Sequence, residues 1–162
     1  MPPEHQGLVR QWSRTAQGLT EVVEELREIS RGLHPAILEK GGLGPALRAL
    51  ARRAGVPVEL SVDVGGRLPE RAEVAAYYVV SEALANAAKH ARASVVRVDA
   101  GLAGGTLRLL VADDGAGGAD PSRGSGLIGL SDRVAAVGGR IEITSPPGGG
   151  TSLLVTIPAG AA

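Results

Sequence analysis

The stretch Pro69–His90, which reads PERAEVAAYYVVSEALANAAKH, decides how the rest of the chain is organised. It predicts a long helix, because Pro69 precedes it, Glu70 and Glu73 occupy its first turn, and no glycine or further proline interrupts it before His90. Most of its residues are apolar. We therefore expect this helix to be buried on more than one side.

A line of polar residues runs along this helix: Glu82, Asn86, Lys89 and His90. Their spacing of i, i+4, i+7 and i+8 places them on one stripe. On a buried helix such a stripe either borders a polar site or forms an ordinary solvated face with a Glu-to-Lys pair. The helix alone leaves both interpretations open.

Length and composition predict one ordinary domain with a helical segment attached. The chain has 162 residues, of which 44% are hydrophobic and 21% charged, so a sizeable core is expected. Basic and acidic residues number 17 each, which argues against a general nucleic-acid binder. The chain has no cysteine, no signal-peptide pattern and no apolar run that could span a bilayer. A cytoplasmic location is therefore expected.

A heptad pattern precedes the domain. Leu19, Leu26 and Leu33 are seven residues apart, and Val22 and Ile29 interleave with them. This seam predicts a helix that packs against a partner helix, in its own chain or in a second copy. The alternative is one amphipathic helix that lies on the domain's own sheet. We expect a helical segment over residues 1–38 and a catalytic domain over residues 39–162.

The remaining patterns alternate between strands and helices. Leu38–Gly44 is expected to be a turn, and Gly101–Gly105 a loop. The predicted strands are Val56–Val64, Ser94–Ala100, Thr106–Ala112, Arg140–Thr144 and Ser152–Ile157, and the further helices are Pro45–Ala54 and Gly126–Val137. This order predicts an α/β two-layer sandwich, a mixed sheet of about five strands with helices on one face.

The segment Asp113–Gly129, DDGAGGADPSRGSGLIG, predicts a ligand-binding loop. Two acids end an apolar strand, and a glycine-rich loop then runs into a helix N-terminus, where backbone amides can bind an anion. Asp113 suits a hydrogen-bond donor such as the exocyclic amine of a purine, whereas Asp114 is expected to face solvent. A glycine cluster alone is more often a flexible loop, so the prediction depends on the whole arrangement.

These motifs resemble the ATP-binding catalytic domain of two-component sensor histidine kinases, in the GHKL ATPase superfamily shared with gyrase and a heat-shock chaperone. Ser81–Ala91 (SEALANAAKHA) resembles the N box, and Asp113–Gly118, Gly124–Val134 and Pro147–Pro158 resemble the three glycine boxes. Arg31–Leu50 resembles the linker and first helix of the subfamily whose response regulators carry a helix-turn-helix.

The resemblance implies roles for the residues of the long helix. Glu82 would orient or deprotonate the nucleophile, or support the metal without binding it directly. Asn86 would bind Mg²⁺ together with the nucleotide phosphates, because an amide oxygen is a suitable hard ligand. Lys89 and His90 would face phosphate oxygens, although His90 also suits a helix C-terminal cap.

The resemblance also implies roles for the glycine-rich segments. Asp113 would accept a hydrogen bond from the adenine amine. Gly115 and Gly117 would give the base room, and the amides around Gly124, Gly126 and Leu127 would bind phosphate. The Thr151 hydroxyl would touch the adenine side, or Thr151 is simply the start of a strand.

The implied activity is that of a protein histidine kinase. It would bind ATP and Mg²⁺ and transfer the γ-phosphoryl group to a histidine on a dimerisation helix, for relay to an aspartate of a response regulator. The expected partners are that regulator, the acceptor helix of the full-length kinase and a second copy, with no direct nucleic acid.

Two departures from the family pattern qualify this implication. The chain has no Phe, so the phenylalanine box is absent, and the loop between Gly118 and Gly124 is short. None of His5, His34 and His90 is followed by an acid, as the family's phospho-acceptor is. We therefore expect a fragment of a longer sensor kinase that retains roughly the second dimerisation helix and lacks its own acceptor.

Two alternatives remain. One is an anti-sigma-type kinase that phosphorylates a serine of a partner protein, against which the heptad seam and the linker motif argue. The other is a nucleotide-binding module without transfer activity, against which Glu82, Asn86 and Asp113 argue.

Overall fold

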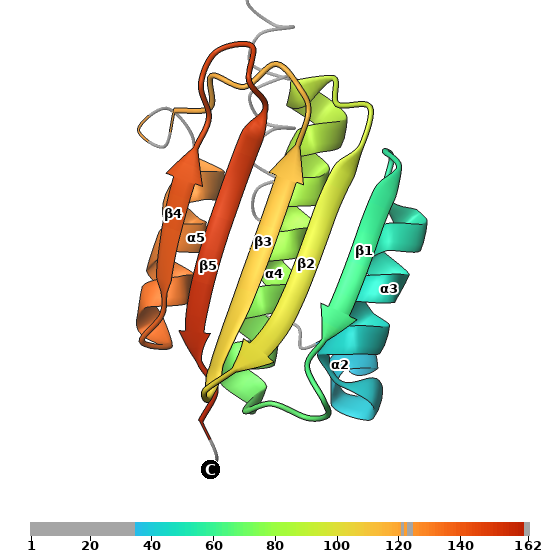
Figure 1. Cartoon of the computed structure of the whole chain (residues 1–162), viewed down its shortest axis with the longest axis vertical. Coiled ribbons are helices and arrows are strands. Elements are labelled where there is room, and N and C mark those ends of the chain that lie inside the picture. Colours follow the sequence, from blue (N-terminus) through green and yellow to red (C-terminus); the bar gives the residue numbers. More distant parts are fainter. Residues whose placement is uncertain (1–34, 121, 123–124, 161–162) are drawn as a thin grey trace, which may run out of the picture. The chain divides into compact units, whose positions relative to one another are not determined.

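The computed structural model describes residues 35–120, 122 and 125–160, which form a five-stranded sheet with helices on one face (Figure 1). The strands are β1 (Val58–Asp63), β2 (Val96–Ala103), β3 (Thr106–Asp113), β4 (Arg140–Thr144) and β5 (Thr151–Pro158). The helices are α2 (Ala36–Gly41), α3 (Leu43–Arg53), α4 (Glu70–Asn86), the π-helix η1 (Ala87–Ala91) and α5 (Ser125–Ala136). The predicted two-layer α/β architecture is confirmed.

The strand order is β1-β2-β3-β5-β4. β1 and β2 are parallel, and α4 lies in the crossover that a parallel pair requires. The other neighbours are antiparallel, so the sheet is mixed as predicted. β2 and β3 form a hairpin around Gly104 and Gly105, whose φ values of 57° and 72° are accessible to glycine and match the twist of a two-residue turn.

The core lies between the sheet and the helices. Leu107 and Leu109 of β3 and Ile157 of β5 are each 0% exposed, and α4 packs Val79 and Val80 toward them from the helical layer. Burial of each such side chain contributes about 1.5–3 kcal/mol. This packing fixes α4 across the sheet, which matters because α4 carries most of the predicted site residues.

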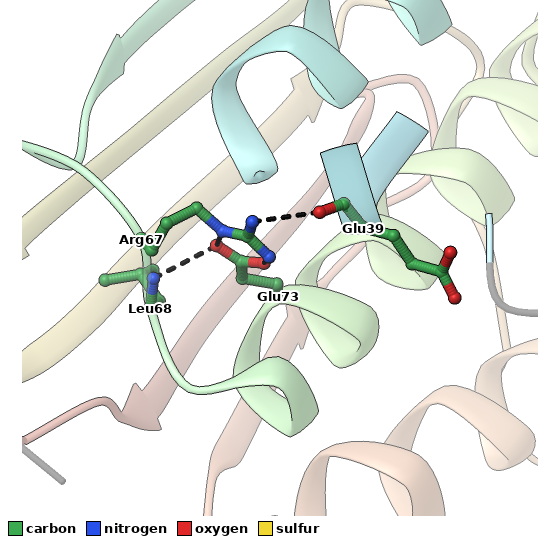
Figure 2. A network of polar contacts seen from close by, with 4 residues as sticks. All are labelled: Glu39, Arg67, Leu68 and Glu73. Atoms are coloured by element: carbon green, nitrogen blue, oxygen red, sulfur yellow. Dashed lines mark hydrogen bonds and ion pairs between the residues drawn. The ribbon is translucent and has the colours of Figure 1, made fainter. Parts of the chain in front are cut away.

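The N-terminal end of α4 is fixed by a polar network around a buried acid, Glu73 (Figure 2). The Glu73 side chain is 2% exposed. It accepts hydrogen bonds from Arg67 Nε at 3.2 Å, from Arg67 Nη2 at 3.1 Å and from the Leu68 amide at 3.0 Å. Arg67 Nη1 donates to the Glu39 carbonyl of α2 at 3.0 Å. Glu73 therefore links α4 to the loop before it and, through Arg67, to α2.

Several predicted boundaries differ from the structure, each for a local reason. The turn predicted over Leu38–Gly44 is mostly helical: its first part lies in the short helix α2, where the Leu38 amide bonds to the Pro35 carbonyl at 2.9 Å and the Leu38 side chain is fully buried. α3 begins before Pro45, which stands in the first turn, where its missing N–H costs no hydrogen bond. β2 continues to Ala103, since the turn needs only the two glycines that follow.

Some predictions concern other parts of the chain. The heptad seam of Leu19–Leu33, together with His5, His34 and Gly124, lies outside the described residues. The division between residues 38 and 39 stays a prediction. α2, which spans that point, belongs to the same compact unit as the sheet, Pro35–Ala162.

Candidate functional site

Three segments meet at one end of the strands, the upper end in Figure 1: η1, the loop after β3 and the connection between β4 and β5. The Ala116 amide donates to the Ala91 carbonyl of η1 at 2.8 Å. The Gly148 amide donates to the Ala116 carbonyl at 2.6 Å, and the Gly150 amide donates to the Gly115 carbonyl at 3.0 Å. The first and the last of the predicted glycine boxes are thus joined by backbone hydrogen bonds.

Close backbone approach gives two of the predicted glycines a reason within the chain itself. A Cβ on Gly115 would collide with the carbonyl of Ala91. A Cβ on Gly117 would collide with the carbonyl of Pro146 and lie 2.8 Å from that of Gly150, and the φ of Gly117 is 62°. Only glycine allows η1, the loop and the β4–β5 connection to approach this closely.

Asp113 is the last residue of β3 and is half-buried. Its Oδ1 accepts the Gly115 amide at 2.8 Å, which fixes the carboxylate in the loop. Asp113 lies opposite Thr151 in the register of β3 and β5. Both continue the strand faces that carry Val111 and Leu153, so both lie on the helix-covered face of the sheet. Within the described residues, no hydrogen bond is donated to Asp113 Oδ2.

Asp114 has a structural role that the sequence did not indicate. It is exposed, as expected, but its carboxylate accepts the Ser94 amide at 2.7 Å, the Val95 amide at 3.1 Å and the Ser94 hydroxyl. The Ser94 hydroxyl first, and then the two amides, hold the pKa of Asp114 below its ordinary value. Asp114 therefore ties the loop to the residues that lead into β2.

The helix that carries the predicted polar stripe changes form at Asn86. Glu82 and Asn86 lie in α4 and are half-buried, whereas Lys89 and His90 lie in η1 and are exposed. A π-helical turn bonds i to i+5, so the predicted spacing of one continuous α-helical stripe is wrong beyond Asn86. Arg92 ends this turn with a φ of 49°, in the left-handed region. Single π-helical turns of this kind are frequent at functional sites.

Glu82 lies against the start of α5. Its Oε1 would be 2.5 Å from a Cβ at Gly126, so the absence of a side chain at Gly126 admits this carboxylate. Leu127 follows and is half-buried. The guanidinium of Arg133 also lies 4.3 Å from the ring centre of Tyr78, which holds α5 to α4 one turn before Glu82. The structure thus places the N box and the second glycine box in contact.

Thr151 makes a hydrogen bond that the sequence did not predict. Its Oγ1 lies 2.8 Å from the Oγ of Ser145, just after β4, and both residues are half-buried. Sequence reasoning missed Ser145 and Ser94 because neither belongs to a motif, and only the folded sheet brings them to the site. Within the described residues, no three histidine, aspartate or glutamate side chains come together as a metal site.

Residues 71–161 match a family model described as histidine kinase-, DNA gyrase B-, and HSP90-like ATPase. The chain belongs to this family. The match covers α4 through β5, which includes every predicted site residue of this ATPase domain. The predicted identity as a histidine kinase-type ATP-binding domain is thereby confirmed.

Known relatives of this ATPase domain are sensor histidine kinases. The sensor histidine kinase NarS of Mycobacterium tuberculosis is 36% identical over 156 residues, covering 90% of this chain and 36% of NarS. The sensor histidine kinase LiaS of Bacillus subtilis is 33% identical over 144 residues, covering 85% of this chain and 40% of LiaS. The chain therefore spans less than half the length of these relatives.

Solved structures agree with this assignment. The blue-light activated histidine kinase of Erythrobacter litoralis EL346 aligns with a TM-score of 0.59 and 30% identity, covering 73% of this chain and 41% of the kinase. The ATPase domain thus shares the fold of a histidine kinase. Among its described helices, none is long and apolar enough to cross a membrane.

Proposed function

We propose that this domain binds ATP with Mg²⁺ and transfers the γ-phosphoryl group to a histidine on a dimerisation helix, from which it passes to an aspartate of a response regulator. The observation that carries the proposal is Asp113, fixed on the helix-covered face by the Gly115 amide and placed opposite Thr151. Its second carboxylate oxygen is available to a donor such as the adenine amine. Because ATP is the substrate, the reaction would take place in the cytoplasm.

The phosphates would extend from the base toward α4 and α5. Asn86, half-buried at the end of α4, would supply an amide oxygen to Mg²⁺, and phosphate oxygens and water would complete its shell. Mg²⁺, when bound, neutralises charge that develops on the transferred phosphoryl group. Lys89 and His90, exposed in η1, would contact phosphate oxygens.

The remaining predicted residues would orient the reactants. The amides around Gly126 and Leu127, in the first turn of α5, would bind phosphate, and Gly124 is proposed to contribute to the same site. Glu82, which lies against Gly126, would orient the attacking imidazole or accept its proton. In this proposal the domain supplies positioning and charge neutralisation, and the partner helix supplies the nucleophile.

Calorimetric titration of Mg²⁺ and ATP into the chain and into Asp113→Ala tests the binding step. Loss of a charged hydrogen bond is expected to weaken binding about ten- to hundred-fold. Asp99→Ala is the matched control, because Asp99 is also half-buried but lies on the opposite face of the sheet, and it should bind ATP as the parent does. A parent chain that binds no ATP at millimolar concentration would overturn the proposal.

The transfer step needs a separate experiment. The chain is incubated with ATP, Mg²⁺ and a longer kinase that carries the acceptor helix but has an inactivated ATP site. Mass spectrometry should find phosphate on a histidine of that helix. A phosphorylated serine on a partner protein would favour the serine-kinase alternative, and nucleotide binding without any labelled protein would favour a binding module.

A further inference from the structure

Ser145 holds together two parts of the site through one side chain and one carbonyl. Its Oγ accepts the Ala119 amide at 2.9 Å and lies 2.8 Å from Thr151 Oγ1. Its carbonyl accepts the Gly118 amide at 3.0 Å. Gly118 and Ala119 belong to the loop that follows Asp113, whereas Thr151 begins β5. Ser145 therefore fixes the position of the loop relative to β5.

The Ser145 hydroxyl also lies in line with the predicted base-binding acid. Asp113 and Thr151 are register partners on the helix-covered face. Ser145 follows Ile143 by two residues, and alternation along β4 places both on that face. Asp113, Thr151 and Ser145 consequently form one row across the end of the sheet.

The donors and acceptors in this row determine whether the Thr151 hydroxyl can donate a hydrogen bond to a ligand. A serine hydroxyl has one proton to donate, and the Ala119 amide already occupies one of its acceptor positions. The Ser145 proton can go to Thr151 Oγ1 at 2.8 Å or to the Gly150 carbonyl at 3.5 Å. Either hydroxyl can be the donor in the 2.8 Å bond, because Ser145 Oγ retains a second acceptor position. Where the Ser145 proton goes to Thr151 Oγ1, the proton of Thr151 is left for a ligand.

We propose that Ser145 is a positioning residue for nucleotide recognition, which turns the Thr151 hydroxyl into a donor beside the Asp113 acceptor. The inference rests on the proposed function. An acceptor next to a donor complements the edge of adenine, where the amine donor adjoins a ring-nitrogen acceptor. It does not complement hypoxanthine, whose six-position carries an oxygen acceptor. Ser145 would therefore contribute to selection of ATP without touching the base.

The test compares the affinities for ATP and for inosine triphosphate, each with Mg²⁺, in five variants and the parent chain. Ser145→Ala should weaken ATP binding about tenfold, as expected for a misdirected hydrogen bond, and change inosine triphosphate binding much less. Thr151→Val should reduce the preference for ATP over inosine triphosphate to the same extent. The double variant should reduce it no further, because both changes remove the same interaction. Ser145→Thr retains the hydroxyl and should recover most of the preference.

Ser152→Ala is the matched control, since Ser152 lies on the opposite face of β5 and should leave both affinities unchanged. Equal losses for the two nucleotides in Ser145→Ala would mean a merely structural role and overturn the inference, as would an unchanged preference. Should Ser145→Ala not fold, Thr151→Val and Ser145→Thr examine the same hydroxyl pair. A parent chain that binds neither nucleotide overturns the proposed function and this inference with it. If the parent chain binds ATP, the proposed ATP binding stands, and the variants alone decide whether Ser145 has a role in selecting ATP.

Discussion

The two ends of α4 differ in whether their polar side chains are hydrogen-bonded within the fold. At the N-terminal end, Glu73 is almost fully buried and its carboxylate is satisfied by Arg67 and Leu68. At the C-terminal end, the Asn86 side chain is half-buried, and nothing in the described part of the chain bonds to it. Lys89 follows in η1 and is exposed. A satisfied polar group stabilises the fold, whereas one that has no partner in the described residues is available to a ligand.

The largest effect is expected at the C-terminal end of α4, where the loop after β3 packs closely on the β4–β5 connection. Gly117→Ala should lower the free energy of unfolding by about 3 kcal/mol, because its Cβ meets the Pro146 carbonyl and the backbone is left-handed. Chemical denaturation measures this. Gly118→Ala is the control: Gly118 has a φ of 73° but nothing within 4 Å of a Cβ, so it should lose only about 1 kcal/mol. Equal losses would show that conformation alone, and not contact, requires Gly117.

The next effect separates the N-terminal network from ordinary surface pairs. Arg67→Met leaves the buried Glu73 carboxylate with only the Leu68 amide, and should cost about 2 kcal/mol of stability. This loss is smaller than is usual for breaking a buried ion pair, because the Arg67 side chain is 54% exposed and water can replace part of its interaction with Glu73. Denaturant titration should show recovery in the Arg67→Met, Glu73→Met double variant, since no buried charge then remains.

Arg97→Met provides the comparison for that measurement. The Arg97–Glu59 pair joins β1 and β2 at 3.2 Å, but its side chains are 64% and 62% exposed. Arg97→Met should therefore lower the free energy of unfolding by no more than about 0.5 kcal/mol. A loss as large as that of Arg67→Met would mean that burial of the acid is not what makes the network important.

A smaller effect, on binding and not on stability, is expected at Asn86. Asn86→Ala should reduce the affinity for ATP in the presence of Mg²⁺ about tenfold, since one metal ligand is lost. The melting temperature without nucleotide should hardly change, because this side chain makes no hydrogen bond within the described residues. Titrations with and without Mg²⁺ separate the two contributions, and an equal loss in both would contradict a metal-binding role.

The smallest effect is expected at Asp114, which follows the predicted site residue Asp113 and whose carboxylate supports the fold. Its pKa is lower in the folded state than its ordinary value of 3.8, so its bonds stabilise the fold above that value and are lost as the pH falls through the folded-state pKa. Asp114→Asn should be slightly less stable than the parent at neutral pH. Thermal unfolding as a function of pH should show the difference shrinking in acid, and a constant difference would contradict the assignment.

The sequence predicted what depends on local chemistry and regular spacing. The five strands and the helix that begins at Glu70 follow from alternation and capping, and the structure has all of them. The first and last glycine boxes follow from their glycine spacing, and the structure joins them by hydrogen bonds. Glu73, in contrast, was predicted only as a charge that suits a helix N-terminus. Its burial depends on Arg67 and on α2, whose short helix was predicted as a turn.

The site was predictable in its motifs but not in its supporting contacts. Asp113 and Thr151 could be named from motif positions, yet their pairing across β3 and β5 follows from strand order, which no local pattern encodes. The π-helical turn at Ala87–Ala91 leaves no mark in the spacing of the apolar residues. Ser145 is an ordinary serine before a proline until the fold brings its hydroxyl to Thr151.

The strand order also bears on self-association. β1 and β4 are the outer strands, and each leaves one row of backbone groups without a neighbouring strand in the described sheet. Such edges can recruit strands from other copies and start aggregation. Both edges are short, six and five residues, and carry exposed charges: Glu59 and Asp63 on β1, Arg140 and Glu142 on β4. Charge and brevity should therefore keep concentrated samples of this unit free of edge-to-edge polymers.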